Sequence, residues 1–402
     1  MPASLDETYE RVLREIGTAN RNHAYRLLQC LMVAIRPLRI EELAEILALD
    51  FDNTKDGVPQ LKEDWRLKDQ QEAVLSTCSS LIAVQKSGFH RVVQFSHFSV
   101  KEFLTSDRLA ASSPEVSHFY ILPEPAHTVI VKASLGILLR SDGGAGDVET
   151  TCSSLGQYAA RYWADHARFQ KVLTHIEDGL QRLFDPAKPF FEAWHNLYDL
   201  DKRWHTFAAS GARPRGSPLY YASFCGLHIM AARLVAKHPT HVNATLGRCL
   251  SPLVAALYNR HFDVAELLYQ HGADVDIKSD INLTPLHAAL MDGFVDIAEW
   301  LLAHGADVMS LLGDQETPLH FSVTNGKFQF VRMLLKYRAS VNAKDGVYRT
   351  PLHLASEDGQ IETVRLLLQH GADIDARDQS YRTPLHLALR RWVSDKLIKP
   401  DS

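Results

Sequence analysis

The chain has 402 residues, of which 46% are hydrophobic and 23% are charged, and its formal net charge is −5. This length favours two or three folding units, because single cores stop growing near about 250–300 residues. The charge leaves no basic surplus for nucleic acid, and five scattered cysteines without a C-x-x-C pair disfavour a zinc knuckle or a disulfide framework.

Nothing in the sequence predicts membrane insertion or export. The longest strongly apolar run, residues 27–35, is too short to span a bilayer. The N-terminus lacks the charged-then-apolar pattern of a signal peptide. We therefore expect a soluble, cytoplasmic or nuclear protein with buried free thiols, no membrane contact, no cofactor and no metal.

Short helices and then a β-hairpin are expected at the start of the chain. Apolar residues fall on one face of each early segment, and β-rich segments flank a Lys-Ser-Gly turn at 86–88. The expected helices span 4–16, 22–35, 41–49 and 69–79, and the expected strands span 80–85 and 90–95. A polar loop is expected between the third helix and Asp64. This order is typical of a winged-helix domain, which we place at residues 1–108.

Winged-helix domains can bind DNA, but this one lacks the necessary charge. The presumed recognition helix begins Asp69-Gln70-Gln71-Glu72. Phosphate contacts need lysine or arginine at such positions. We therefore expect no nucleic-acid partner.

Residues 109–212 are expected to form a helical linker region. Aromatic residues recur there at helical spacing, at Tyr158, Tyr162, Trp163, Phe169, Phe190, Phe191, Trp194 and Tyr198. They could line a ligand site or form a core face. Helical spacing favours the core face.

A Ser/Thr-Pro-Leu triplet recurs through the last part of the chain. Its prolines are spaced by 34 residues once and by 33 thereafter, at Pro218, Pro252, Pro285, Pro318, Pro351 and Pro384. The hydroxyl residue can cap a helix whose first position suits proline. A second helix then supplies a Leu-Leu pair and ends at a glycine such as Gly272, which suits a left-handed turn.

These units resemble ankyrin repeats. The T-P-L-H motif is complete at Thr284–His287, Thr317–His320, Thr350–His353 and Thr383–His386. The resemblance implies a mainly α-helical solenoid over residues 213–402, with about five and a half repeats, the last cut short by Pro400. We expect the motif histidines to hydrogen-bond backbone rather than bind metal.

Several positions depart from the repeat. Tyr220 and Val254 occupy the histidine position of the first two repeats. Arg260 replaces an inter-helix glycine, and Arg338 replaces a helix-terminal one. If Arg338 is left-handed, it costs about 1–2 kcal/mol.

The first half resembles a known signalling family. The segments that carry the likeness are 4–13, 36–45, 95–104, 157–167 and 183–189. They look like the winged helix and linker of fungal NACHT-type signalling NTPases, which often end in ankyrin repeats. The resemblance implies a nucleotide-driven switch of the innate-immunity kind. However, the chain contains no G-x-x-x-x-G-K-[S/T] motif to hold phosphates.

His97 belongs to the same resemblance. Within that family, an H-x-S-x-x-E-[F/Y] motif carries a histidine that contacts the β-phosphate of ADP, and His97, Ser99, Glu102 and Phe103 match it. Without a P-loop in this chain, we expect His97 to cap or pack the helix that it begins. In a longer product with an NTPase domain, it would be the nucleotide contact.

The function that we expect is a non-catalytic scaffold that binds a partner protein on the concave face of the solenoid. The alternative is the sensor half of a NACHT-type switch. No enzyme motif is present, so we expect neither catalysis nor a small-molecule substrate.

The candidate contact residues lie at hairpin tips and on an inner helix, at Tyr348, Arg349, Tyr381, Arg382, Glu357 and Asp358. Tyrosine and arginine are enriched at binding hot spots, although such residues can also be ordinary solvated tips. The glutamate and aspartate would add an acidic strip. Alanine at all four tip positions is predicted to abolish partner capture with thermal stability nearly unchanged.

Overall fold

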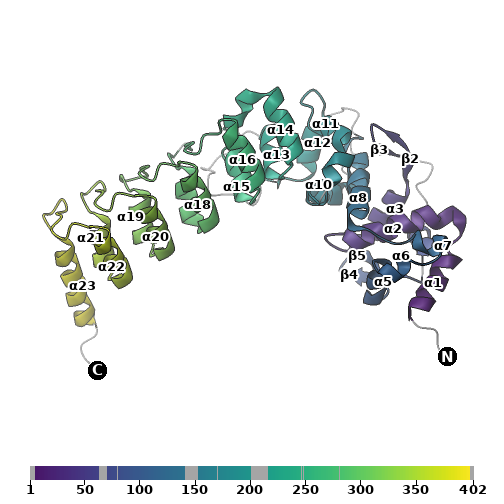
Figure 1. Cartoon of the computed structure of the whole chain (residues 1–402), viewed down its shortest axis with the longest axis horizontal. Helices are drawn as coiled ribbons and strands as arrows, with labels where there is room; N and C mark the ends of the chain where they lie inside the picture. Colours follow the sequence, from purple (N-terminus) through teal and green to yellow (C-terminus); the bar gives the residue numbers. More distant parts are fainter. Residues whose placement is uncertain are drawn as a thin grey trace. The chain divides into compact units, whose positions relative to one another are not determined.

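The computed structural model describes residues 5–62, 70–78, 80–140, 153–169, 171–200, 216–245, 247, 249–279 and 281–398. Contacts divide the chain into two compact units, residues 1–203 with 225–234 and residues 204–224 with 235–402. The first contains a small sheet among helices, and the second consists of paired helices (Figure 1). The chain is thus mainly helical, as predicted.

The start of the first unit has the order of a winged-helix domain. Its helices are α1 (Leu5–Glu15), α2 (Arg21–Val33), α3 (Ile40–Leu47) and α4 (Gln70–Cys78), with a 3-10 turn η1 at Thr18–Asn20. They precede the antiparallel hairpin of β4 (Ile82–Ser87) and β5 (His90–Phe95). A short strand β1 (Leu38–Arg39) pairs with β5, so the sheet order is β1-β5-β4. The turn is Gly88-Phe89, and β4 therefore runs to Ser87, past the predicted end.

A second hairpin replaces most of the polar loop predicted up to Asp64. Strands β2 (Leu49–Lys55) and β3 (Val58–Leu61) pair antiparallel around Asp56-Gly57. Both turn residues have positive φ, 53° and 72°, as tight hairpin turns of the Asp-Gly type require. The loop prediction was wrong because β2 is exposed throughout Asp52–Lys55 and therefore lacks the alternation of a half-buried strand.

The helices that follow pack onto the winged helix rather than forming a separate connector. They are α5 (Phe98–Leu104), α6 (Asp107–Ala110), α7 (Pro114–Ser117), α8 (Pro123–Leu138), α10 (Ser154–Ala167), η3 (Val172–His175), α11 (Glu177–Leu183) and α12 (Phe190–Leu197). Helix α8 contacts α2, and α10 contacts α3. Leu155 and Tyr158 belong to the same hydrophobic cluster as Leu27 and Leu43. Helices α8 and α10, from the region predicted as a linker, therefore belong to the core of the first unit.

The aromatic residues of this region form a core face, which confirms the sequence interpretation. Trp163 and Trp194 are buried, with ring centroids 5.4 Å apart in an edge-to-face contact. Phe184 lies against both indoles. The Trp194 Nε1–H donates to the carbonyl of Ala160 at 2.8 Å, so the polar tip of that indole is satisfied.

Most helices of the ankyrin repeats belong to the second unit. The first of them is α13 (Pro218–Phe224); the next, α14 (His228–Lys237), belongs mostly to the first unit. The helix pairs that follow are α15 (Pro252–Tyr258) with α16 (Phe262–Gln270), α17 (Pro285–Asp292) with α18 (Val295–Ala303), α19 (Pro318–Thr324) with α20 (Phe328–Lys336), and α21 (Pro351–Glu357) with α22 (Ile361–Gln369). A 3-10 turn η5 spans Pro239–Asn243. A last helix, α23 (Pro384–Ile398), follows the sixth Thr-Pro-Leu triplet. Each proline begins its helix, as the spacing predicted.

The two arginines at glycine positions are both left-handed, so the condition stated for Arg338 is met. Arg260 has φ 61° and Arg338 has φ 66°, whereas Gly371 at the equivalent helix end has φ 84°. A bulky residue in this region is strained relative to glycine.

Tyr220 takes over the role of the missing motif histidine. Its hydroxyl accepts a hydrogen bond from the backbone N–H of Cys249 at 3.0 Å, 29 residues later in the sequence. The ring leaves no room for a side chain at Gly247, whose φ is 82° and whose Cβ would lie 2.4 Å from the ring. The first repeat is thus still hydrogen-bonded to the next repeat, through a tyrosine instead of a histidine.

The described cysteines are buried free thiols, as predicted. They are Cys30, Cys78, Cys225 and Cys249; Cys152 lies outside the described residues. Burial raises the pKa of Cys30 to about 12, so this thiol stays protonated. Among the described helices, none has both the length and the apolar composition needed to cross a bilayer.

Candidate protein-binding surface

Each candidate tip hairpin is organised by a buried aspartate. In the tip before α21, the Asp345 carboxylate accepts hydrogen bonds from the backbone N–H of Val347 at 3.0 Å and of Arg349 at 2.8 Å. The Arg349 Nε donates to the same carboxylate at 2.9 Å. Turn amides and a guanidinium thus hold the tip in one conformation.

The next tip repeats this arrangement one repeat later. Asp378 accepts from the backbone N–H of Ser380 and of Arg382, and from the Arg382 Nε, each at 2.8 Å. Burial alone raises the pKa of Asp378, but the hydrogen bonds from Arg382 and Ser380 outweigh it and hold the pKa below its ordinary value. The carboxylate is therefore charged when the tip is formed.

The two predicted tip arginines are consequently part of the hairpin framework. Each pairs with an aspartate four residues earlier that is itself buried. Removing the arginine would leave that carboxylate short of a charged partner, which is costly for a buried charge. The expectation that four alanine substitutions leave stability nearly unchanged therefore needs correction for Arg349 and Arg382.

The two tyrosines, by contrast, are presented to solvent. Tyr348 is 55% exposed and Tyr381 is 77% exposed. Their φ angles are 60° and 59°, and the equivalent positions of earlier repeats, Asn282 and Gln315, are left-handed too. Asparagine tolerates this conformation well, whereas a bulky aromatic residue rarely adopts it. The tyrosines are thus strained and exposed at once.

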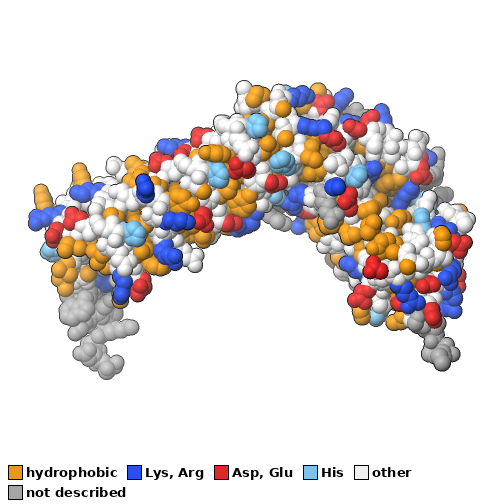
Figure 2. Space-filling view, viewed as in Figure 1, with side chains coloured by type: hydrophobic (Ala, Val, Ile, Leu, Met, Phe, Trp, Pro, Cys, Tyr) orange, Lys and Arg blue, Asp and Glu red, His pale blue; other side chains and the backbone are white. Residues whose placement is uncertain are grey.

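Adjacent tips are joined to one another by backbone hydrogen bonds. The N–H of Gly346 donates to Asp314 O at 2.7 Å, and the N–H of Gln379 donates to Val347 O at 3.0 Å. Tyr348 and Tyr381 therefore stand on neighbouring, connected hairpins. Figure 2 shows hydrophobic side chains projecting from the tips at the C-terminal end of the repeats.

Two of the motif histidines, His320 and His353, hydrogen-bond the backbone of these hairpins, as expected for a structural role. His320 Nε2 is 3.0 Å from Arg349 O, and His353 Nε2 is 3.0 Å from Arg382 O. Their Nδ1 atoms each bond the threonine that caps the same helix, at 2.9 Å. No group of three or more potential metal ligands occurs among the residues that the structure describes.

The predicted acidic strip is partly neutralised by arginines. Glu357 Oε1 pairs with Arg390 at 2.8 Å, and its other oxygen lies 3.9 Å from Arg349. Asp358 follows α21 as its C-cap and accepts from Gln360 Nε2 at 3.4 Å. This helix end therefore offers mixed charge rather than an isolated acidic surface.

His97 lies in the first unit, where it caps α5 as expected. Its Nδ1 accepts from the backbone N–H of Ser99 at 3.3 Å and lies 2.6 Å from the Ser99 hydroxyl. That hydroxyl is also 2.8 Å from the Tyr9 hydroxyl, so α5 is tied to α1. With Nδ1 accepting, the neutral ring carries its proton on Nε2.

The two aspartates that shape the tips, Asp345 and Asp378, were not among the residues predicted from the sequence. The available signal was the Asp-x-x-x-Arg spacing at 345–349 and again at 378–382, in register with the repeat. The helix expected near residues 69–79 is confirmed as α4, with Glu72 exposed on it; Asp69 lies outside the described residues.

Comparison with known families identifies two kinds of domain in this order. Residues 10–114 match the winged helix domain of GPI inositol-deacylase. Residues 277–345 match a family of three ankyrin repeats, and residues 249–280 and 348–379 each match the single ankyrin repeat. The chain is therefore a winged-helix domain followed by ankyrin repeats, and the repeats indicate binding to proteins.

One relative extends across much of the chain. The azaphilone pigments biosynthesis cluster protein L of Monascus ruber is 32% identical over 280 residues, which cover 65% of this chain and 58% of that protein. The chain thus matches less than two thirds of the length of this fungal relative.

Proposed function

We propose that this chain is a non-catalytic scaffold that captures a partner protein with the hairpin tips of its C-terminal ankyrin repeats. The observation that carries the proposal is the pair of exposed tyrosines held in left-handed backbone on adjacent tips. Strained residues persist where function repays their cost, and exposed tyrosine is a frequent hot-spot residue. We expect this scaffold to act in the cytoplasm or the nucleus.

The rigidity of the tips supports this role. Asp345 and Asp378 hold the turns, His320 and His353 hold them from beneath, and neighbouring tips share backbone hydrogen bonds. A surface that is ordered before binding loses less conformational entropy when the partner arrives. The tyrosine rings can then contribute most of their contact energy to the complex.

The test replaces both tyrosines by asparagine, the residue that the chain itself has at the equivalent position 282. Asparagine suits the left-handed backbone, so the double variant Tyr348→Asn/Tyr381→Asn should unfold at the same or a higher temperature. Capture of partners from an extract of the source organism, quantified by mass spectrometry, should fall about tenfold or more for the true partner.

The matched control is Phe89→Ser, which removes a fully exposed aromatic ring from the β4–β5 turn of the other unit. This variant should capture the partner as well as the parent chain does. Equal capture by the tyrosine double variant would contradict the proposal.

A second candidate function is the sensor half of a NACHT-type nucleotide switch. It is favoured by His97, whose Nδ1 is engaged by Ser99, so that its Nε2–H is the donor left to meet a phosphate. Titration of the purified 402-residue chain with ADP tests this candidate. Tight binding that is lost in His97→Ala favours the switch and contradicts a scaffold that binds no nucleotide.

A further inference from the structure

The two tyrosine-bearing tips, residues 344–349 and 377–382, share a second exposed feature, which is a cation four residues before each tyrosine. Lys344 precedes Tyr348 and Arg377 precedes Tyr381, so the two pairs are in register with the 33-residue repeat. Both cations are exposed. The Lys344 Nζ lies 5.6 Å from the centroid of the Tyr348 ring, so the cation and the ring form one surface.

These two cations have no ion-pair partner among the residues that the structure describes. The carboxylates next to them in the sequence, Asp345 and Asp378, are buried and already paired with Arg349 and Arg382. An ion pair is neutral overall, so the unpaired cation determines the charge that each tip presents to solvent. Each tip therefore offers a positive charge beside an exposed tyrosine.

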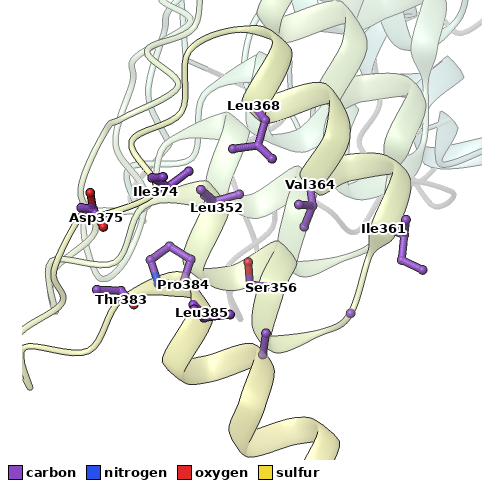
Figure 3. Close-up of a pocket in the computed structure, with 12 residues that line it drawn as sticks. Leu352, Ser356, Ile361, Val364, Leu368, Ile374, Asp375, Thr383, Pro384 and Leu385 are labelled. Atoms are coloured by element: carbon purple, nitrogen blue, oxygen red, sulfur yellow. The ribbon is translucent and has the colours of Figure 1, made fainter.

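Two exposed carboxylates, Asp373 and Asp375, precede the last tip but leave this charge in place. Asp373 accepts a hydrogen bond from the backbone N–H of Asp375 at 3.0 Å. Asp375 lines an apolar pocket beside α23, together with Ile374 and Leu385 (Figure 3). In the described part of the chain, neither carboxylate forms an ion pair with Arg377. The guanidinium of Arg377 thus stays available to a partner.

The preceding tip, residues 311–316, carries the opposite charge. It contains Asp314 and Glu316 but no lysine or arginine, and Asp314 is exposed. This tip is joined to the next one by the hydrogen bond from the N–H of Gly346 to Asp314 O at 2.7 Å. The charge therefore changes sign between neighbouring tips, and the positive charge is a local property of the two tips that also carry tyrosine.

We propose that the partner meets these two tips with an extended, acidic peptide segment. Its aspartate or glutamate carboxylates pair with Lys344 and Arg377, and its apolar side chains lie on the tyrosine rings. The N–H of Gln379 donates to Val347 O at 3.0 Å, so the tips are adjacent and one extended chain can reach both. This inference rests on the proposed function and specifies the chemistry of the partner.

The number of cations favours a peptide over other polyanions. Each tip has one unpaired cation, whereas anionic membranes and nucleic acids are bound by clusters of several lysines and arginines. Two carboxylates spaced along one peptide match two cations spaced along one row of tips. Complementary charge of this kind governs specificity and the association rate more than it governs affinity.

The test begins with displayed random peptides of about twelve residues, which span about 40 Å when extended. They are selected on the full 402-residue chain and depleted on the variant Tyr348→Asn/Tyr381→Asn, so that only peptides that need the tyrosines remain. We expect the enriched peptides to be rich in aspartate and glutamate. Enrichment of neutral or basic peptides would overturn the proposal.

Charge reversal at the tips then measures what the cations contribute. In Lys344→Glu/Arg377→Glu, the affinity for a synthetic copy of an enriched peptide should fall about tenfold or more. Lys344→Gln/Arg377→Gln, which places no glutamate beside Asp345, should show a smaller loss. The matched control is Arg332→Glu/Arg365→Glu, because these exposed arginines are also 33 residues apart but lie on α20 and α22. This control should bind the peptide as the parent chain does.

The salt dependence of the kinetics gives a second readout. Between about 50 mM and about 500 mM salt, the association rate of the peptide should fall about tenfold, with a smaller change in the dissociation rate. An association rate that is independent of salt would contradict the proposal, as would equal binding by the charge-reversal variant.

The outcomes separate this inference from the proposed function. Peptides that need the tyrosines but not the cations would overturn the inference and leave the tips as a binding surface. If selection yields no peptide that needs the tyrosines, the result counts against both. Cosedimentation with phosphatidylserine vesicles that depends on Lys344 and Arg377, without peptide binding, would assign the tips to a membrane surface and overturn the proposal.

Discussion

Arg338 stands at the end of α20, where the neighbouring repeats have glycine. Its φ of 66° lies in the left-handed region, and the side chain is exposed. The equivalent Gly272, Gly305 and Gly371 have φ of 84° to 88°. The conformation is thus set by the repeat and not by the residue.

Substitution Arg338→Gly should therefore stabilise the ankyrin unit by about 1 kcal/mol. Relief of left-handed strain outweighs the extra entropy that glycine gives to the unfolded chain. The free energy of unfolding, measured by urea denaturation, checks this. The reciprocal change Gly371→Arg is the control. Its Cβ would meet no atom within 4 Å, so it should destabilise the protein through the backbone conformation alone. A loss of stability in Arg338→Gly would refute the argument.

Single residues were predicted well where the repeat supplied a reference and poorly where a loop decided the contact. That Arg260 and Arg338 replace glycines followed from the alignment of the repeats. The pairing of Arg349 with Asp345 did not, because two charged residues four apart in a loop meet only if the turn brings them together. The strain at Tyr348 was likewise invisible without the backbone angles.

At the level of elements, α8 and α10 are joined by a pair of histidines, the half-buried His127 and the fully buried His166. His166 Nδ1 lies 2.9 Å from His127 Nδ1, and His166 Nε2 lies 2.9 Å from the Tyr158 hydroxyl. Burial, and then the neighbouring His127, lower the pKa of His166 to about 3. The pair is therefore stable with His166 neutral.

This pair predicts acid sensitivity of the first unit. In the unfolded chain His166 binds a proton below about pH 6.5, whereas in the folded chain it stays neutral, so folding is disfavoured as the pH falls. The contribution amounts to about 2 kcal/mol between about pH 6.5 and pH 5. Urea denaturation at both pH values should show a smaller loss in His166→Gln than in the parent chain. An unchanged loss would assign the acid sensitivity to other groups.

Elements with a strong period were predicted from the sequence, and those without one were not. The 33-residue spacing located the helix pairs of the repeats, and helical periodicity located α1 to α3. The β2–β3 hairpin was missed because Asp50, Asp52 and Asn53 make its first strand read as a loop, although Asp56-Gly57 carried the turn signal.

For the whole molecule, the order of domains was predicted but the extent of the first core was not. Helices α8 and α10 were assigned to a linker, yet they share a hydrophobic cluster with α2 and α3. Their apolar faces indicate burial, but a sequence does not state which surface buries them.

The central claim, that a partner binds the tyrosine-bearing tips, is tested most directly by photo-crosslinking. Benzoylphenylalanine at position 381 replaces an exposed ring by a reactive one, and the same residue at position 89 provides the matched site in the other unit. With the partner captured from extract, our account predicts a crosslink from position 381 and none from position 89. A crosslink from position 89 alone would contradict it and place the binding surface on the winged helix.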